Sequence, residues 1–504
     1  MAGSGMKSLA KDTAIYGLSS IVGRLLNYCL VPLHVYIFTN PAEYGQVNYI
    51  QGFTALFFVL LTYGMETGFF RFMNKQDENP LRVYSTSLIS LGATSLLFIL
   101  LCFSFINPIS EWMQYTEHKE HITMMSIVVA LDAFMVIPFA YLRYQKRPLR
   151  FAALKLVFIF SNILFTVLFL VICPWLSKNY PDFILNPFYH QSIGIGYIFL
   201  ANLISTLIVL LLLIPNTMKH LRFQFDINLL KRILKYSFPL LILGLAGVIN
   251  QAVAQLTYPF IFDNKEEAFS QLGIYSACIK ITVIITMFTQ AFRYAYEPFF
   301  FSKNKEDGNT KPYADAMKYF IIFALLVFLG VMFYIDIIKH IISENYTVGI
   351  FIVPIAMMGE ILFGVYFNLS VWYKLTDKTK YGAYFSILGC LIQVVMNIVL
   401  VPIYGYVASA WATFVCNLIL VIISYIIGQK YYPIKYDIKN ILFYFILAIV
   451  FYAVAMYPTI DNELLRLTYR TVFLVIFTAI IIKKDLPLTE IPYLNRFFSK
   501  KKTK

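Results

Sequence analysis

The sequence predicts an all-α polytopic membrane protein with fourteen transmembrane helices. Of its 504 residues, 59% are hydrophobic and only 13% are charged, whereas soluble domains carry about 25% charged residues. Apolar stretches recur along the whole chain, and most have about the 20 residues that a helix needs to cross a hydrocarbon core about 30 Å thick. The predicted spans are approximately residues 13–38, 47–70, 83–106, 122–142, 152–176, 193–215, 237–262, 272–300, 317–338, 348–373, 382–401, 406–428, 440–458 and 464–482.

The cationic residues alternate between the two sides of these spans. Of the 41 Lys and Arg residues, 32 fall in the N-terminus, every second loop and the C-terminal tail, and 4 fall inside spans. The opposite loops carry only Lys119, Lys178, Lys265, Lys339 and Arg466. Because cytoplasmic loops retain Lys and Arg, we predict a bacterial cytoplasmic (inner) membrane protein with both termini in the cytoplasm. The net charge of +14 then reflects a basic face beside anionic lipid headgroups, and we expect no nucleic acid partner.

The loops and cysteines exclude several classes of protein. No loop between spans exceeds about 20 residues, and the chain has no Gly-x-x-x-x-Gly-Lys phosphate loop. A catalytic or nucleotide-binding module is therefore not expected, and we predict a transporter, not an enzyme, with no cofactor beyond a coupling H⁺ or Na⁺. The six cysteines form no Cys-x-x-Cys pair, and we interpret them as buried free thiols without a metal site.

The first and seventh spans align with an offset of 227 residues, which becomes 228 after the following loop. The segment 17–24 aligns with 244–251, Pro32 aligns with Pro259, and Gly45 aligns with Gly273. Six spans separate the copies, so both halves enter the membrane in the same direction as a parallel repeat. We predict an N-terminal lobe over residues 1–225, a C-terminal lobe over 226–432, and two additional spans with a basic tail over 433–504.

Two motifs carry a family resemblance. Pro41-Ala-Glu-Tyr-Gly45 recurs in altered form as Ser270-Gln-Leu-Gly-Ile-Tyr275, and Pro402-Ile-Tyr-Gly-Tyr-Val-Ala-Ser-Ala-Trp-Ala-Thr413 resembles the entry to a twelfth span. With fourteen spans, residues 7–490 resemble the oligosaccharide (O-antigen-type) lipid flippases of the multidrug/oligosaccharidyl-lipid/polysaccharide exporter superfamily. Val407-Ala408 departs from the family's second glycine region, which affects helix packing more than chemistry. The resemblance implies two six-helix lobes around a central cavity, alternating access, and an undecaprenyl-pyrophosphate-linked glycan as the substrate.

Cations inside the spans are candidates for binding a pyrophosphate. Arg24 lies midway along the first span, Lys280 lies in the eighth, and Arg293 lies near the cytoplasmic end of the eighth. Charged groups in the hydrocarbon are costly and usually face a cavity. The alternatives are a packing ion pair for Arg24, snorkelling to the outer headgroups for Lys280, and a helical pair with Glu297 for Arg293.

Three acids inside the spans are candidates for ion coupling: Asp132, Glu360 and Glu66. A buried carboxylate that exchanges a proton or Na⁺ suits a rocking cycle. The alternative for Asp132 and Glu360 is a salt bridge to Arg24 or Lys280. For Glu66 we favour a structural role beside Arg71.

Amides extend this polar lining, and sugars are bound by amide groups. The candidates for a glycan cavity are Asn27, Asn250, Gln251 and Gln255, with Gln290, Gln393 and Asn397 as further members of the set. Ordinary hydrogen bonding between helices is the alternative. The outer loop Glu117-His-Lys-Glu-His121 carries two histidines three residues apart, and we interpret it as a solvated loop without a metal site.

The sequence thus favours a flippase that moves a polyprenyl-pyrophosphate-linked oligosaccharide to the outer leaflet, with membrane lipids, glycan polymerase and assembly enzymes as partners. A flippase for the peptidoglycan precursor shares the layout but tends toward more cationic cavities. A cation-coupled multidrug exporter usually has twelve spans and few cations in them. A scaffold for assembly enzymes would not need unpaired charges in the membrane.

Overall fold

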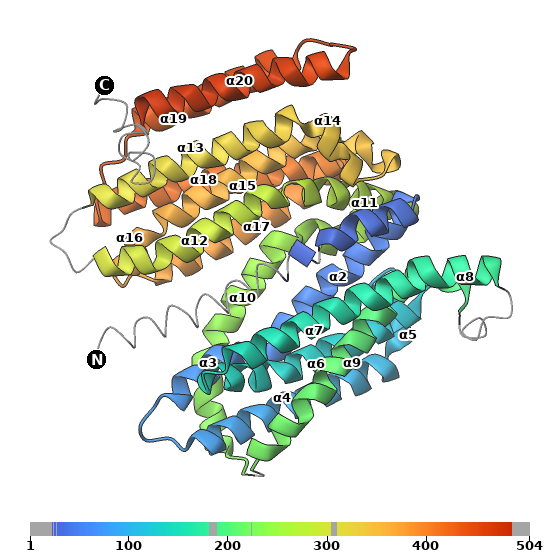
Figure 1. The fold of residues 1–504 in the computed structure, drawn as a ribbon. Coiled ribbons are helices and arrows are strands. Elements are labelled where there is room, and N and C mark those ends of the chain that lie inside the picture. The colour runs from blue at the N-terminus through green and yellow to red at the C-terminus, as the bar shows by residue number, and fades with distance from the viewer. Residues whose placement is uncertain are drawn as a thin grey trace, which may run out of the picture. The chain divides into compact units, whose positions relative to one another are not determined.

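The computed structural model describes residues 23, 25–26, 28–180, 189–222, 224–303 and 310–485, and within these ranges the regular structure is helical, without strands (Figure 1). Twelve of the described helices are long and apolar enough to cross a membrane, and a bent pair raises the number to 13. The all-α class is therefore confirmed. The predicted number of fourteen is not reached in this part of the chain, because only Tyr28–Ile37 of the first span forms a described helix.

The chain divides into two compact units. The first comprises residues 1–277 and 383–409, and the second comprises 278–382 and 410–504. The helices of the first unit are α2 (Pro41–Thr62), α3 (Met65–Met73), α4 (Pro80–Ser104), α5 (Ile106–Trp112), α6 (Lys119–Tyr144), α7 (Pro148–Val167), α8 (Cys173–Asn179), α9 (Gly196–His220), α10 (Ile227–Ile261), most of α11 (Lys265–Ile281) and most of α17 (Lys380–Tyr404). A π-helical turn, Leu168–Ile172, joins α7 to α8, and a short 3₁₀ turn, Gln191–Ile193, precedes α9.

The second unit holds the helices of the C-terminal half. They are α12 (Val283–Lys303), α13 (Lys311–Phe333), α14 (Ile335–Ile338), α15 (Val353–Leu369), α16 (Val371–Leu375), most of α18 (Tyr406–Tyr431), α19 (Ile438–Met456) and α20 (Glu463–Lys484). Two 3₁₀ segments, Lys339–Ile341 and Glu344–Ile352, lie between α14 and α15. In the first unit, α10 packs along α2, α3 and α4. This packing groups α10 with the N-terminal helices, while the lobe boundary at residue 225 stays a prediction about the repeat.

Local sequence sets where several helices begin. Asn40 and Asn79 each precede a proline, and their side-chain oxygens accept hydrogen bonds of 3.0 Å from the backbone N–H groups of Ala42 and Leu81. Proline at the first helical position has no N–H to satisfy, and Asn at the N-cap satisfies one of the others. The long helix α10 begins in the same way, because Asp226 accepts from the backbone of Asn228 and Leu229.

Two spans are interrupted. Between α2 and α3, Tyr63 and Gly64 adopt left-handed conformations with φ of 34° and 70°. A Cβ atom on Gly64 would also lie 2.9 Å from the Ser237 carbonyl oxygen of α10, so glycine suits both the turn and the close packing. The eighth predicted span consists of α11 and α12, which meet at an angle of 50°.

The two glycines aligned by the repeat contact each other's segments reciprocally. A Cβ atom on Gly45 would lie 1.8 Å from the Phe269 carbonyl oxygen, and one on Gly273 would lie 1.9 Å from the Pro41 carbonyl oxygen. Gly273 lies 228 residues after Gly45, and Phe269 lies 228 residues after Pro41. The two contacts are therefore equivalent, and α2 and α11 cross with local two-fold symmetry. Only glycine permits such a close approach of two backbones. The repeat read from the sequence is thus expressed in a specific helix crossing.

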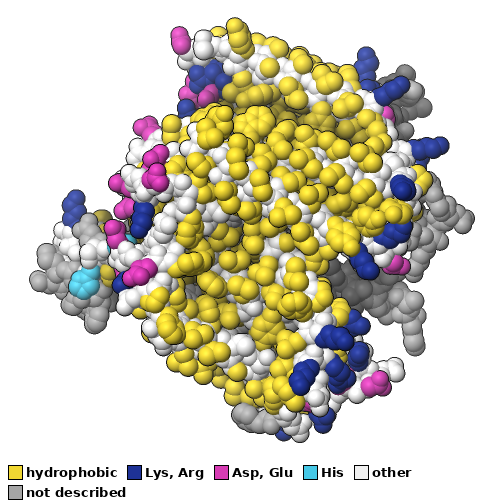
Figure 2. Space-filling view, turned by 180° about the vertical axis from the view of Figure 1, so that it is seen from behind, with side chains coloured by type: hydrophobic (Ala, Val, Ile, Leu, Met, Phe, Trp, Pro, Cys, Tyr) yellow, Lys and Arg dark blue, Asp and Glu magenta, His cyan; other side chains and the backbone are white. Residues whose placement is uncertain are grey.

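Apolar side chains fill most of the middle of the face seen in Figure 2, and the Lys and Arg side chains on it lie mainly toward its edges. Leu96, Leu211, Ile403 and Ile446, for example, are each at least 59% exposed in the isolated chain. Large apolar side chains with this much exposed surface indicate that the helices are surrounded by lipid. Together with the spans, this pattern identifies a multi-pass membrane protein.

Candidate functional site

A cavity of about 340 Å³ inside the first unit gathers four charged side chains. Glu66 of α3, Asp132 and Arg143 of α6, and Lys155 of α7 all line it. Its remaining lining is largely aromatic and aliphatic: Phe58, Met135, Val136, Phe139, Phe151, Phe158 and Val209. Two acids and two bases in an apolar enclosure balance in charge, and such groups are costly in a membrane unless they are paired or functional.

Glu66 and Arg143 form a direct ion pair. The Arg143 guanidinium also lies over the Phe70 ring, 5.0 Å from its centroid. The partner of Glu66 is thus Arg143 and not the neighbouring Arg71, because residues five apart on a helix point about 140° away from each other. Arg71 instead lies over the Tyr236 ring at 4.0 Å. The structural role proposed for Glu66 remains compatible with its pairing to Arg143.

The second acid of this cavity, Asp132, differs from Glu66. In the described part of the chain, Asp132 has no ion-pair partner within 4 Å. Its closest electrostatic partner is Lys155, whose ammonium group lies 4.3 Å from the centroid of the Phe139 ring. Lys155 thus has an aromatic face on one side and carboxylates within electrostatic reach, since both Asp132 and Glu66 act on it. A proton or a small cation arriving at Asp132 would change the balance of all four charges.

The sequence interpretation missed two residues of this cavity, Arg143 and Lys155, and the sequence did carry a signal for Lys155. We counted it among the cytoplasmic loop cations, although it lies inside the predicted span 152–176. Pro148 marks the first turn of α7, which places Lys155 about two turns into the helix. Pro148 is therefore the sequence feature from which the position of Lys155 inside the helix could have been predicted.

In the second unit, two predicted site residues lie on the interface between α12 and α15. Thr286 Oγ1 donates a hydrogen bond of 3.3 Å to Glu360 Oε2, and the Arg293 guanidinium lies 4.3 Å from the centroid of the Phe367 ring. Glu360 and Phe367 are seven residues apart, about 10.5 Å along the helix, so the structure does not pair Glu360 with Arg293. The Glu297 side chain lies outside the described part. Lys280 is half-buried near the end of α11.

The amide candidates divide into different environments. On α10, Gln251 is exposed, Asn250 is half-buried, and Gln255 packs against Gly52 of α2, where an added Cβ atom would lie 2.7 Å from the Gln255 Cβ. Buried Asn397 donates to the Gln393 carbonyl oxygen at 2.8 Å and accepts from Ser409, whose hydroxyl also bonds Tyr258. Asn397 therefore makes the hydrogen bond between helices that was its alternative role, whereas its bond to Gln393 lies within α17. Arg24 and Asn27 lie outside the described residues.

An apolar cavity of about 580 Å³ lies inside the second unit, beside α19. Its walls come from α13, α15, α18 and α19 and include Met358, Leu362, Phe414, Leu442 and Phe445. Tyr425 and Tyr436 are the lining residues that carry a polar side-chain atom. Such a cavity can hold a hydrocarbon chain, whereas it has no charged side chain or amide to bind a phosphate or a sugar.

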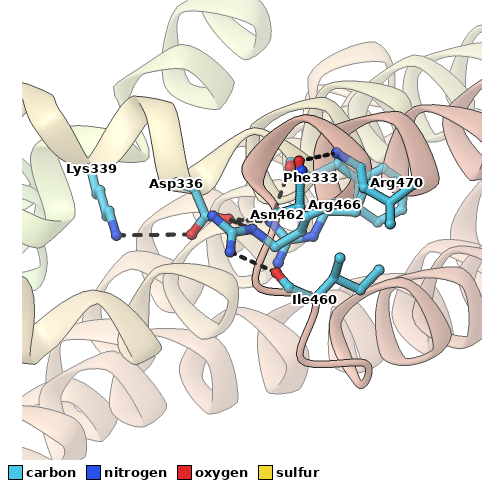
Figure 3. Close-up of polar contacts among 8 residues, drawn as sticks. Phe333, Asp336, Lys339, Ile460, Asn462, Arg466 and Arg470 are labelled. Carbon is cyan, nitrogen blue, oxygen red and sulfur yellow. Dashed lines mark hydrogen bonds and ion pairs between the residues drawn. The ribbon is translucent and has the colours of Figure 1, made fainter.

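A second charge cluster ties α20 to the end of α13 and α14 (Figure 3). Asp336 lies between Arg466 and Arg470, with nitrogen–oxygen distances of 2.9 and 2.7 Å, and Lys339 is 4.0 Å away. The arginines also donate to backbone, Arg466 to the Ile460 carbonyl and Arg470 to the Phe333 carbonyl. This arrangement resembles a clamp between helices more than a ligand site.

Comparison with protein families identifies the chain. The model of a family described as "Polysaccharide biosynthesis protein" matches residues 9–303, more than half of the sequence. The chain belongs to this polysaccharide biosynthesis family. The match covers all four charged residues of the cavity in the first unit, and it confirms the resemblance to oligosaccharide lipid flippases of the exporter superfamily.

Solved structures with similar folds are transporters. The structure titled "Lipid II flippase MurJ, inward closed conformation" matches with a TM-score of 0.69 and 17% identity, over 93% of this chain and 98% of that one. An inward-facing multidrug resistance MATE family transporter matches with a TM-score of 0.63 and 14% identity, over 81% and 94%. These likenesses show the fold of this polysaccharide biosynthesis protein and confirm the MATE-like architecture.

A curated relative adds no function. An uncharacterized membrane protein of Haemophilus influenzae (strain ATCC 51907 / DSM 11121 / KW20 / Rd) is 22% identical over 408 residues, which cover 76% of this chain and 88% of that protein. The similarity extends beyond the segment matched by the family model, because it covers a larger share of this polysaccharide biosynthesis protein.

Proposed function

We propose that this protein flips a polyprenyl-pyrophosphate-linked oligosaccharide from the cytoplasmic to the outer leaflet by alternating access. The family match carries the proposal, because polysaccharide biosynthesis without a catalytic domain leaves transport as the step that a membrane helix bundle can perform. The similarity of the fold to a lipid flippase and to an inward-facing transporter supports the mechanism. No bond is made or broken, so the protein acts as a carrier and not as an enzyme.

The cavity of the first unit is our candidate for ion coupling. Arg143 already neutralises Glu66, which leaves Asp132 opposite Lys155 as the pair able to change state. When Asp132 takes up a proton or Na⁺, Lys155 loses an attractive partner, and the helices α6 and α7 that carry them are free to shift. Glu360 is a second coupling candidate in the second unit, held by Thr286.

The headgroup would be held by the cations predicted from the sequence: Arg24, Lys280 and Arg293. Arg supplies a fork of donors that fits phosphate oxygens, and Lys supplies a mobile point charge. Asn27, Asn250 and the exposed Gln251 remain candidates for contacts with the glycan, whereas the packing of Gln255 against Gly52 favours a structural role for that residue.

The polyprenyl tail needs an apolar path, and the cavity beside α19 offers one. Its volume of about 580 Å³ and its nearly complete hydrocarbon lining fit part of an isoprenoid chain. Burial of apolar surface stabilises such a complex by about 25 cal/mol per Å². We therefore assign the tail to the second unit, in keeping with a role for the two additional spans.

A transport assay with two cargoes tests the proposal. Proteoliposomes containing the full chain receive a fluorescent polyprenyl-pyrophosphate disaccharide in one experiment and a cationic dye in another. We expect translocation of the glycolipid, and its loss in Arg24→Ala but not in the exposed loop control Arg147→Ala. Dye transport without glycolipid movement would contradict the proposal and favour a multidrug exporter. Preference for a lipid-linked muropeptide over the disaccharide would favour a peptidoglycan-precursor flippase.

A further inference from the structure

The first turn of α6 brings together three side chains that are typical metal ligands. His118 is the N-cap residue, and Glu120 and His121 follow in the first turn. One ligand atom from each lies within 4.8 Å of the others. His118 Nδ1 is 3.1 Å from Glu120 Oε1, and the same oxygen is 3.9 Å from His121 Nε2.

His121 is the unusual member of this group, because it is a polar side chain buried without full hydrogen bonding. Only 1% of its surface is exposed, which corrects the expectation of a solvated loop. Its Nδ1 atom is 2.8 Å from the Tyr115 hydroxyl, whereas Nε2 has no hydrogen-bond partner in the described part of the chain. A buried polar atom left unsatisfied costs about 1–3 kcal/mol, so a missing ligand at Nε2 is a direct explanation.

The surroundings of Nε2 hold the ring in place and include a glycine beside it. The Phe199 ring of α9 packs against His121 with centroids 4.8 Å apart. Gly196 begins α9, and a Cβ atom there would lie only 2.8 Å from Nε2. Glycine at position 196 therefore keeps the open side of the imidazole free of a side chain.

His118 of the cluster also lines a neighbouring cavity of about 310 Å³. His118 and Tyr115 line it together with Glu43, Gln46 and Glu117. The side chains of His118 and Glu120 are 38% and 58% exposed, so an ion can reach them without opening the helix bundle. The carboxylates at the entrance also attract cations electrostatically.

We propose that His118, Glu120 and His121 bind a divalent transition-metal ion, with Zn²⁺ as the best match. Two imidazoles and one carboxylate with a water molecule in the fourth position form a common zinc coordination set. Ligand atoms around tetrahedral zinc lie about 3.3 Å apart, so rotation of the exposed His118 and Glu120 side chains completes the geometry. The positive end of the α6 dipole opposes the ion, and we expect weaker binding than at a closed structural zinc site.

Tyr115 acts as a positioning residue in this site. Its hydroxyl accepts from Nδ1–H of the tautomer that leaves the Nε2 lone pair free for the ion. Removal of such a partner typically lowers metal affinity by about 10-fold to 100-fold. The occupied site would fix the connection between α5 and α6 against α9, within the first unit.

The test is a Zn²⁺ titration of the purified full chain in nanodiscs after treatment with a chelator. We expect one ion per chain, with an affinity at least about 10-fold lower in His118→Ala and in Glu120→Gln. Both side chains are partly exposed, so these variants should fold. His340→Ala, which removes a histidine from the second unit, serves as the matched control and should bind like the wild type.

Tyr115→Phe and X-ray absorption sharpen the result. Tyr115→Phe should weaken binding without removing it, and the zinc-loaded wild type should show two imidazole ligands. The proposal is overturned if the wild type does not bind Zn²⁺, or if His118→Ala and Glu120→Gln bind it as tightly as His340→Ala does. The latter result would mean adventitious binding elsewhere on the chain.

Discussion

The two charge clusters of the molecule differ in what surrounds their acids. In the first unit, Asp132 lies in a cavity of about 340 Å³ and faces Lys155 without a direct ion pair in the described chain. In the second unit, Asp336 is bonded by Arg466 and Arg470, and both arginines also donate to backbone carbonyls. The acid of the first cluster lies beside a cavity without a direct ion pair, whereas the acid of the second is in direct contact with two arginines.

This difference indicates which charges can move. A charge beside unfilled space can exchange its partner at low cost, which a transport cycle requires. A charge that two cations contact directly holds helices together, and removal of one partner leaves the others uncompensated. We therefore expect changes at Asp132 and Lys155 to affect transport, and changes at Asp336 to affect stability.

The largest effect is expected from Asp336→Ala. Arg470 has 7% of its side chain exposed and would become an uncompensated charge, so the free energy of unfolding should fall by roughly 3 kcal/mol. Thermal unfolding in detergent measures this loss, with the exposed Asp461→Ala as the control. If translocation per folded molecule fell while the melting temperature stayed unchanged, Asp336 would belong to the transport machinery and the comparison would fail.

Lys155→Met should instead reduce translocation and leave the stability of the fold unchanged. Methionine retains the apolar stem beside Phe139 but removes the charge that faces Asp132, so the helix should stay folded. We expect translocation to fall roughly 5-fold to 150-fold, the usual range for lost coupling between sites. Glycolipid translocation in proteoliposomes measures the effect, with exposed Lys146→Met as the matched control. A wild-type translocation rate in Lys155→Met would show that the positive charge of Lys155 is not needed for transport.

Glu66→Gln should give a smaller loss of stability, because the ion pair with Arg143 is partly exposed to solvent. The two side chains are 42% and 33% exposed, so screening reduces the expected destabilisation to about 1 kcal/mol. The double variant Glu66→Gln/Arg143→Gln should recover part of that loss, because it leaves no uncompensated charge. Equal stability of Glu66→Gln and the wild type would show that the pair contributes nothing.

The smallest effect concerns Asp485, just after α20. Burial alone would raise the pKa of this carboxyl, but hydrogen bonds from Tyr444 at 2.6 Å and Lys318 at 2.9 Å outweigh it and hold the pKa below its ordinary value. A lowered folded-state pKa means that the stabilisation is present above the unfolded value of about 3.9 and is lost as the pH falls through the folded value.

Acidification below about pH 4 should therefore loosen the end of α20 in the wild type. Asp485→Asn should abolish this component. Identical acid sensitivity of the wild type and Asp485→Asn, measured by thermal unfolding across pH, would assign the effect to other groups.

Much of the fold could be predicted because hydrocarbon imposes a simple rule on the sequence. Spans need about 20 apolar residues, so α4, α6, α9 and α13 lie close to the predicted segments. The aligned glycines were also informative, since Gly45 and Gly273 meet at one crossing. The division into compact units follows helix packing, which the repeat alone does not determine.

The site was less predictable because its geometry depends on residues distant in sequence. Asp132 and Glu66 could be selected as costly charges, but the pairing of Glu66 with Arg143 depends on how α3 packs against α6. His121 appeared solvated in its loop because Phe199 and Gly196, which bury it, come more than 70 residues later. Burial of single polar groups is a property of packing.

The most direct test of the account is the dependence of glycolipid translocation on an imposed H⁺ or Na⁺ gradient, compared between the wild type and Asp132→Asn. Exposed Asp263→Asn, from the loop after α10, is the matched control. We predict that a gradient accelerates the wild type and Asp263→Asn, while Asp132→Asn stays slow at every gradient. The same gradient response in Asp132→Asn as in the wild type would contradict the claim that the cavity of the first unit couples ion movement to flipping.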